Sequence, residues 1–177
     1  MSRSPRSAAA VGSAAQVPKP VAISGTVWLD NNLDAVRQTD ESPLADVELA
    51  LSVRGTNGSY LDTGHRVRTD ANGRYEFAKS LGLAPGEYRI TQTQPAGLFS
   101  VAAIPGTVDG QAAGVASGAN VISSIDIALG DTEAVDMDFA EAQPSRIGGF
   151  VYADDNDNGR RDSGEAGIAG VTVRLVP

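Results

Sequence analysis

Short stretches of this chain alternate apolar residues with polar or small ones, which gives a hydrophobic period of two residues rather than that of a helix. Residues 47–53 follow this alternation, and residues 121–129 repeat it with one serine among the apolar positions. In residues 87–93, Tyr88 and Ile90 alternate with polar neighbours. Because successive side chains of a strand point to opposite faces, each stretch is predicted to be a strand with one buried face.

Turn signals separate the predicted strands. An Asn-Gly dipeptide within residues 69–77 predicts a tight hairpin, with Tyr75 and Phe77 on one face of its second strand. A Pro-Gly dipeptide at residues 85–86 marks the next turn. Residues 99–119 are rich in glycine and alanine and are predicted to form a long surface loop.

The last predicted strand of this set alternates Val135, Met137 and Phe139 with two aspartates. We therefore expect residues 21–142 to form an all-β domain, an antiparallel sandwich of about seven strands with two packed sheets. The residues expected in its interior are Val27, Leu49, Tyr75, Phe77, Tyr88, Ile90, Ile127 and Phe139.

The hydrophobic pattern of residues 23–30 returns at residues 147–154 with a constant offset of 124 positions. The same offset, without a gap, aligns Asn32 with Asn156, Asp34 with Asn158, Glu41 with Glu165, and Leu51 with Leu175. A match maintained over this length is typical of a tandem repeat. The sequence therefore predicts one full repeat at residues 21–142 and the start of a second, incomplete copy at residues 143–177.

The two ends of the chain differ from this sandwich. Residues 1–20 are rich in serine and alanine and are predicted to be a flexible leader or linker without an export signal. The second copy is too short to bury much apolar surface on its own, so we expect residues 171–176 to be loosely held or to borrow packing from the first domain. We interpret the chain as a fragment of a longer repeat protein.

Composition and charge narrow the function. Twenty glycines and nine prolines fit a turn-rich β protein, and a net charge of −8 disfavours nucleic acid as a partner and suits cation binding. The absence of cysteine excludes disulfides, thiolate metal sites and cysteine nucleophiles. With His65 as the single histidine and no serine-nucleophile motif, the sequence favours a non-catalytic protein. No apolar run approaches the length of a membrane span.

The most specific chemical pattern is the twelve-residue stretch 154–165. Its spacing is that of a calcium loop, D-x-[DN]-x-[DN]-G-x5-E, in which alternate side chains converge on the ion and a glycine permits the sharp turn. The candidate ligands are Asp154, Asn156 and Asn158 at positions one, three and five, the carbonyl of Arg160 at position seven, Asp162 at position nine and Glu165 at position twelve. Hard oxygen ligands without histidine or cysteine favour calcium over zinc or copper.

We considered two alternatives to a calcium loop between strands, a turn that binds no metal and the helix-loop-helix of an EF-hand. Asp, Asn and Gly are also common in solvated turns that bind no metal. The flanking residues 148–152 and 167–175 are rich in glycine and in β-branched or aromatic residues, so we expect strands there rather than the helices of an EF-hand. The sequence predicts a calcium loop that joins two strands.

The first repeat carries a weaker copy of the loop. Its candidate ligands are Asp30, Asn32, Asp34 and Glu41, at positions one, three, five and twelve. Ala35 replaces the glycine at position six, where a side chain should strain the turn, and Gln38 replaces the aspartate at position nine. A plain acidic loop is the alternative to calcium binding here.

Several motifs together resemble the SD-repeat protein B domain, a Cna-B-type module of bacterial surface proteins. The resemblance covers residues 21–142 and the start of the next copy, and implies an immunoglobulin-like or prealbumin-like sandwich that binds calcium in loops and stacks in tandem as a rigid spacer. It also implies an extracellular or cell-surface location and neighbouring repeats of the same chain as partners. The matching motifs are Val27-Trp28-x-Asp30, the acidic loop, Thr69-Asp70-x-Asn72-Gly73-x-Tyr75-x-Phe77, Leu83-x-Pro85-Gly86-x-Tyr88 and Gln94-Pro95-Ala96-Gly97.

An adhesion module that binds a host or extracellular-matrix protein, or a glycan, is the alternative function. Glycan sites usually need exposed aromatic side chains, and Trp28, the single tryptophan, is expected to pack in the domain core. The predicted loop at residues 99–119 is the other candidate for direct adhesion.

Overall fold

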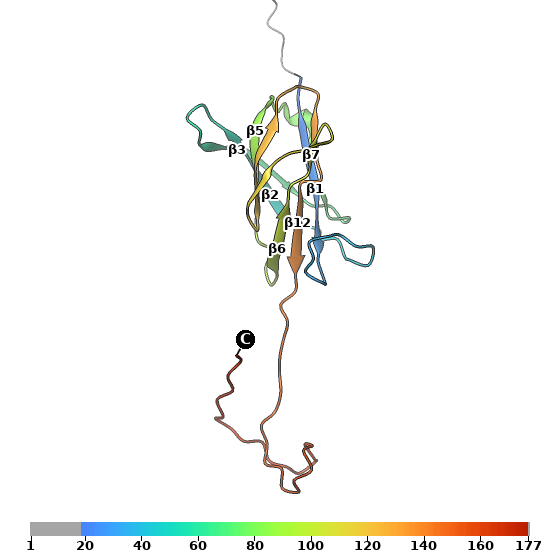
Figure 1. The fold of residues 1–177 in the computed structure, drawn as a ribbon, viewed down its shortest axis with the longest axis vertical. Coiled ribbons are helices and arrows are strands. Elements are labelled where there is room, and N and C mark those ends of the chain that lie inside the picture. Colours follow the sequence, from blue (N-terminus) through green and yellow to red (C-terminus); the bar gives the residue numbers. More distant parts are fainter. Residues whose placement is uncertain (1–18, 177) are drawn as a thin grey trace, which may run out of the picture. The chain divides into compact units, whose positions relative to one another are not determined.

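The structure, a computed structural model, describes residues 19–176 and divides the chain into two compact units, Met1–Pro144 and Ser145–Pro177. Most of the predicted leader, residues 1–18, lies outside the described residues. The first unit is a sandwich of two β-sheets, as predicted (Figure 1). Within residues 19–176, no helix is long and apolar enough to cross a membrane.

The first sheet has seven strands in the order β6-β12-β1-β11-β7-β8, with β4 paired to β1, and the second has five in the order β3-β2-β5-β10-β9. A 3-10 turn, η1 (Lys79–Leu81), follows β4. The strands are β1 (Ala22–Leu29), β2 (Glu48–Arg54), β3 (Tyr60–Arg68), β4 (Arg74–Phe77), β5 (Gly86–Gln92), β6 (Phe99–Ile104), β7 (Thr107–Val108), β8 (Gln111–Ala112), β9 (Val115–Gly118), β10 (Val121–Ile127), β11 (Glu133–Val135) and β12 (Asp138–Ala142).

The interior confirms the pattern of alternation. All eight residues predicted to be inside belong to one buried cluster between the sheets. Trp28 is also buried, at 2% exposure, but it lies outside that cluster. It follows Val27 on β1, so it points to the opposite face of the sheet.

Two local predictions for the first unit were wrong at turns and loops. The Asn-Gly turn exists, but the chain passes through it from β3 in one sheet to β4 in the other, so no hairpin forms there. The stretch 99–119 is mostly strand, because β6 pairs with β12, β7 pairs with β8 and β11, and β9 pairs with β10. Small residues obscured this alternation, since glycine and alanine carry little hydrophobic signal.

The last predicted strand is two strands, β11 and β12, separated at Asp136, which has a positive φ of 59°. Both strands run parallel to β1, so the sandwich is antiparallel except along this strand. In the gap, the N–H of Met137 donates to the carbonyl of Ser24, and the N–H of Thr26 donates to Oδ1 of Asp138 at 2.6 Å. Of the two aspartates that flank Met137, Asp136 therefore bends the backbone between β11 and β12, and the Asp138 side chain accepts a backbone hydrogen bond from β1.

The second unit contains no strand among its described residues, although strands were predicted on both sides of its loop. It has one isolated bridge, between Tyr152 and Gly167. Its large apolar residues stay exposed, with Val173 at 78% and Leu175 at 79%. A strand needs partners for its backbone groups, and the unit supplies too few neighbouring segments.

Candidate metal-binding loops

The first acidic loop, Asp30 to Glu41, leaves the end of β1 and is closed by backbone contacts at its base. The N–H of Leu29 donates to the carbonyl of Ser42 at 2.8 Å, and Trp28 forms a bridge with Pro43. The N–H of Asp30 donates to the carbonyl of Glu141 at 2.7 Å, which fixes the first position of the loop against β12. The loop therefore starts from a rigid support.

Asp30 organises the inside of this loop. Its side chain is buried, at 1% exposure, and accepts hydrogen bonds from the backbone N–H groups of Leu33 at 2.6 Å, Asp34 at 3.3 Å and Ala35 at 2.8 Å. Leu33 and Ala35 have positive φ values of 63° and 58°, which non-glycine residues adopt at a cost. The expected left-handed strain at position six is therefore present at Ala35.

The last position of the loop folds back on the same turn. Glu41 is buried, and its two oxygens accept the N–H groups of Asn31 at 3.0 Å and Gln38 at 2.9 Å. Asp34 lies at the surface, where a hydrogen bond from the Gln38 side chain is the main cause of its lowered pKa. The two buried carboxylates thus hold backbone donors from both halves of the loop.

The second loop, Asp154 to Glu165, repeats this arrangement outside any sandwich. Asp154 accepts the N–H groups of Asn158 at 3.1 Å and Gly159 at 2.7 Å, and the bond from Gly159 is the main cause of its lowered pKa. Gly159 has a φ of 71°, which glycine adopts freely. Glu165 accepts the N–H of Asp162 at 2.9 Å through Oε2, and its Oε1 is buried without a hydrogen-bond partner among the described residues.

The closing contacts at the base are the same in both loops. The N–H of Ala153 donates to the carbonyl of Ala166 at 3.0 Å, as Leu29 does to Ser42. The bridge between Tyr152 and Gly167 occupies the positions equivalent to Trp28 and Pro43. The loops therefore close in the same way although one lies on a sandwich and the other does not.

Position nine distinguishes the two loops chemically. In the first, the Gln38 amide donates to Asp34 Oδ2 at 2.8 Å. In the second, Asp162 Oδ2 accepts the side-chain amides of Asn156 at 2.8 Å and Asn158 at 2.7 Å, and these bonds lower its pKa, the one from Asn156 most. The second loop has an anionic oxygen where the first has a neutral amide.

The predicted ligands lie in their loops in register. Within residues 19–176, no group of three or more His, Cys, Asp or Glu side chains is arranged to hold a metal ion. The carboxylates at positions one and twelve use oxygens to accept backbone N–H groups. An ionised carboxylate offers about four lone-pair directions, so each retains capacity for a cation.

A buried polar network near the first loop was missed by the sequence analysis. Glu141 has no exposed surface, and its carboxylate accepts the side-chain amides of Gln92 at 2.5 Å and Gln94 at 2.6 Å. The carbonyl oxygen of the Gln92 side chain is buried and has no hydrogen-bond partner in the described part of the chain. The available signal was that Glu141 is two positions after Phe139 in a strand, which places a charge on the face of a core residue.

A β-sandwich with a twelve-residue acidic loop after its first strand, and a second copy of that loop 124 positions later, defines a tandem-repeat β module. The family model described as "SdrD B-like domain" matches residues 21–140 and again residues 145–177. This chain belongs to the SdrD B-like domain family.

Among curated proteins, the chain is similar to "Serine-aspartate repeat-containing protein C" of Staphylococcus aureus strains N315 and Newman. The identity is 33% over 149 residues, which is 84% of this chain and 14% of the relatives. The chain thus spans a small part of their length.

Two solved structures show a distant likeness. The pilus adhesin RrgA from Streptococcus pneumoniae is 18% identical with a TM-score of 0.36, and the alignment covers 72% of this chain and 16% of the adhesin. The major plantain pollen allergen Pla l 1 is 13% identical with a TM-score of 0.38, and covers 71% of this chain and 97% of the allergen. Likenesses this low support no argument about function.

Proposed function

We propose that this chain is a non-catalytic structural module of an extracellular or cell-surface repeat protein, stabilised by calcium in its acidic loops. The observation that carries the proposal is the repeated loop: two segments in different surroundings close with the same backbone contacts and present the same carboxylates at positions one and twelve. A shared geometry that does not depend on the sandwich points to a function of the loop itself.

The donor chemistry fits calcium. Each loop presents carboxylate, amide and main-chain oxygens, which are the ligands that calcium takes in flexible, high-coordination sites. The buried Oε1 of Glu165 has no hydrogen-bond partner within residues 19–176, and a bound cation would satisfy it. The ligand sets include neutral amides at Asn32, Asn156 and Asn158, and a low ligand charge suits the weak sites of extracellular modules.

A spacer role fits the junction between the repeats. The last strand of the sandwich, β12, ends at Ala142, and Arg146 is the position equivalent to the first residue of β1. The three residues between them, 143–145, include Pro144. A short linker with proline limits the angles that two successive repeats can adopt.

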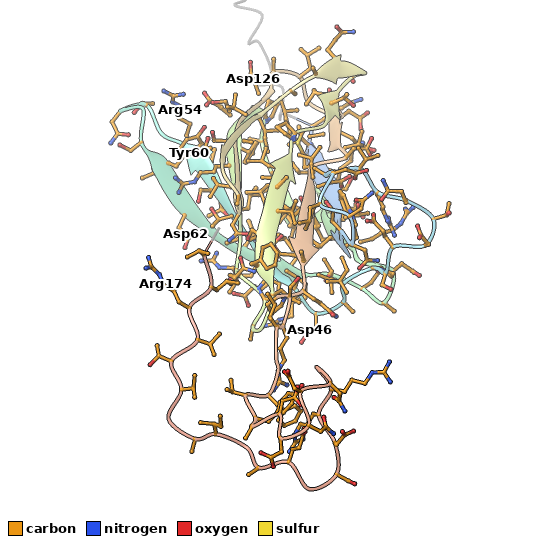
Figure 2. All side chains as sticks on the ribbon, turned by 60° about the horizontal axis from the view of Figure 1, so that its bottom comes forward. Asp46, Arg54, Tyr60, Asp62, Asp126 and Arg174 are labelled. Carbon is orange, nitrogen blue, oxygen red and sulfur yellow. The ribbon has the colours of Figure 1, made fainter. Side chains whose placement is uncertain are left out.

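Among the aromatic residues of the first unit, Phe99 at the start of β6 is 44% exposed, and the others give glycan binding little support. Trp28, Tyr75 and Tyr88 are buried. Tyr60 lies beside Arg54 in Figure 2, and its ring is 4.7 Å from the guanidinium of Arg89. Its hydroxyl donates to Glu87 at 2.7 Å, so this ring is part of a structural contact rather than a free platform.

The test follows thermal unfolding of the whole chain by the fluorescence of Trp28, the single tryptophan, in calcium, in magnesium and in chelator. The calcium sample should melt highest. If a ligand binds only the folded form, a free ligand concentration of about ten times its dissociation constant raises the free energy of unfolding by about 1.4 kcal/mol.

The Glu41→Gln variant serves as the matched control, because it removes one anionic ligand near Trp28 and should abolish most of the shift. Melting curves that coincide in calcium and chelator, or an equal shift with magnesium, would reject calcium-specific stabilisation.

A further inference from the structure

Three Asn-Gly dipeptides lie in the described part of the chain, at Asn57, Asn72 and Asn158. Such pairs can deamidate without an enzyme. The glycine nitrogen attacks the asparagine Cγ and loses its proton, the amide nitrogen leaves as ammonia, and a cyclic imide forms. Water then opens the ring to aspartate or isoaspartate. The reaction needs an accessible nucleophile, a polarised carbonyl and a proton acceptor.

All three features occur at Asn158 in the second loop. The N–H of Gly159, the attacking nitrogen, donates to Asp154 Oδ2 at 2.7 Å, so its proton can pass along an existing bond to a carboxylate and on to water. The N–H of Arg160 donates to Asn158 Oδ1 at 2.7 Å, which polarises the carbonyl and stabilises the negative charge that develops on this oxygen. A Cβ at Gly159 would have no neighbour within 4 Å, and Asn158 and Gly159 are both exposed, so neighbouring residues do not crowd this turn.

Asn72 lacks this arrangement. The N–H of Gly73 donates to the backbone carbonyl of Asp70 at 2.9 Å, which is a weaker proton acceptor than a carboxylate. Gly73 is buried against Val27 and Pro43, so the backbone cannot rearrange into a ring without disturbing the first loop. The sandwich should therefore protect Asn72.

Asn57 is the closer comparison, because it also lies in an exposed turn. Its Oδ1 accepts the N–H of Ser59 at 3.0 Å, which reproduces the carbonyl contact at Asn158. The N–H of Gly58, however, donates to the backbone carbonyl of Gly55 at 2.9 Å. The two sites differ mainly in the group that faces the attacking nitrogen, a carboxylate at Gly159 and a peptide carbonyl at Gly58.

We propose that Asn158 is a site of spontaneous deamidation, promoted by Asp154 and by the N–H of Arg160, which adds a negative charge to the second loop. The aspartate product would place a carboxylate at position five, as Asp34 does in the first loop. This consequence for a cation rests on the proposed calcium function, whereas the reaction itself does not. A cation held by Asp154 and Asn158 would compete for the same oxygens and slow the reaction.

The test ages the full chain at mildly alkaline pH in chelator and measures deamidation at all three sites in one digest by peptide mass spectrometry. Asn158 should convert fastest, and Asn57 and Asn72 serve as internal controls. The Asp154→Asn variant keeps the size of the side chain but removes the charged acceptor. In this variant the deamidation rate at Asn158 should fall by at least about tenfold, while the rate at Asn57 should stay unchanged.

Conversion of Asn57 as fast as that of Asn158, or an unchanged rate at Asn158 in the Asp154→Asn variant, would overturn the proposal. A parallel arm in calcium separates it from the proposed function. Fast conversion of Asn158 that calcium does not slow would support the modification site and count against calcium binding in this loop.

Discussion

The two repeats carry matching sequences in different surroundings. Ile23 and Leu49 have no exposed surface, whereas their equivalents Ile147 and Val173 are 79% and 78% exposed. The acidic loops nevertheless close with the same hydrogen bonds in both repeats. The comparison teaches that the loop is specified by contacts within about fifteen residues, while the strands require partners from distant parts of a complete repeat.

A glycine substitution should separate the repeats most strongly. A Cβ at Gly25 would overlap the carbonyl oxygen of Met137, whereas one at the equivalent Gly149 would have no neighbour within 4 Å. Because the obstruction is backbone, we expect Gly25→Ala to destabilise the sandwich by at least about 4 kcal/mol. Gly149→Ala should leave its melting temperature unchanged. Equal effects on thermal unfolding would show that the repeats do not differ as described.

A core truncation tests the same contrast through packing. Leu49→Ala removes a fully buried side chain and should cost about 3 kcal/mol. Val173→Ala, at the equivalent exposed position, should stay within about 0.5 kcal/mol. Urea unfolding of both variants measures the difference. A loss above about 1 kcal/mol for Val173→Ala would indicate that residues 171–176 pack in solution.

Substitutions of the aspartates at loop position one, Asp30 and Asp154, should differ less in their effect on stability than the substitutions above. Asp30→Ala leaves the N–H groups of Leu33 and Ala35 without their acceptor in a buried place, so we expect a loss of about 1–2 kcal/mol in chelator. Asp154→Ala affects an exposed loop outside the sandwich and should not change sandwich unfolding. Chemical unfolding of both variants without calcium measures this effect, and an unchanged Asp30→Ala variant would contradict the role given to that carboxylate.

The smallest expected effect concerns pH. Burial raises the pKa of Asp138 above the ordinary value, although the N–H of Thr26 lowers it in part. The folded state therefore binds this proton more tightly than the unfolded state, and the stability gained is lost as pH rises through the raised pKa. Asp138→Asn, whose amide oxygen can still accept the Thr26 N–H, should stabilise the sandwich at pH 7 by less than about 1 kcal/mol.

This advantage should disappear below pH of about 4, where the carboxyl is protonated in both states. The measurement is the unfolding midpoint of the parent protein and of Asp138→Asn at a series of pH values from about 7 to below about 4. A gain that persists at acid pH would assign the effect to packing rather than to the charge.

Sequence alone predicted the interior of the sandwich, because residues such as Leu49, Ile90 and Phe139 alternate with polar or small neighbours. It did not predict the passage from β3 to β4 between sheets, since an Asn-Gly turn has the same local signal whether or not its flanking strands pair. The break at Asp136 and the network at Glu141 also depend on contacts across the sheets. Short-range patterns cannot specify such contacts.

The candidate ligands were found from spacing alone, and the structure places them in two loops of matching geometry. The positive φ of Ala35 was anticipated from the missing glycine. What spacing could not give is the use that the carboxylates make of backbone N–H groups, because this depends on the folded turn. Calcium binding itself stays a prediction.

Calorimetric titration of calcium into the whole chain, into Glu165→Gln and into Glu41→Gln tests the central claim most directly. Both loops close alike, so the donor set should decide affinity: the second loop has Gly159 in place of Ala35 and Asp162 in place of Gln38. We predict calcium-dependent heat in the parent protein and a larger loss of binding for Glu165→Gln than for Glu41→Gln. An absence of heat in the parent, or equal losses in the two variants, would contradict the account.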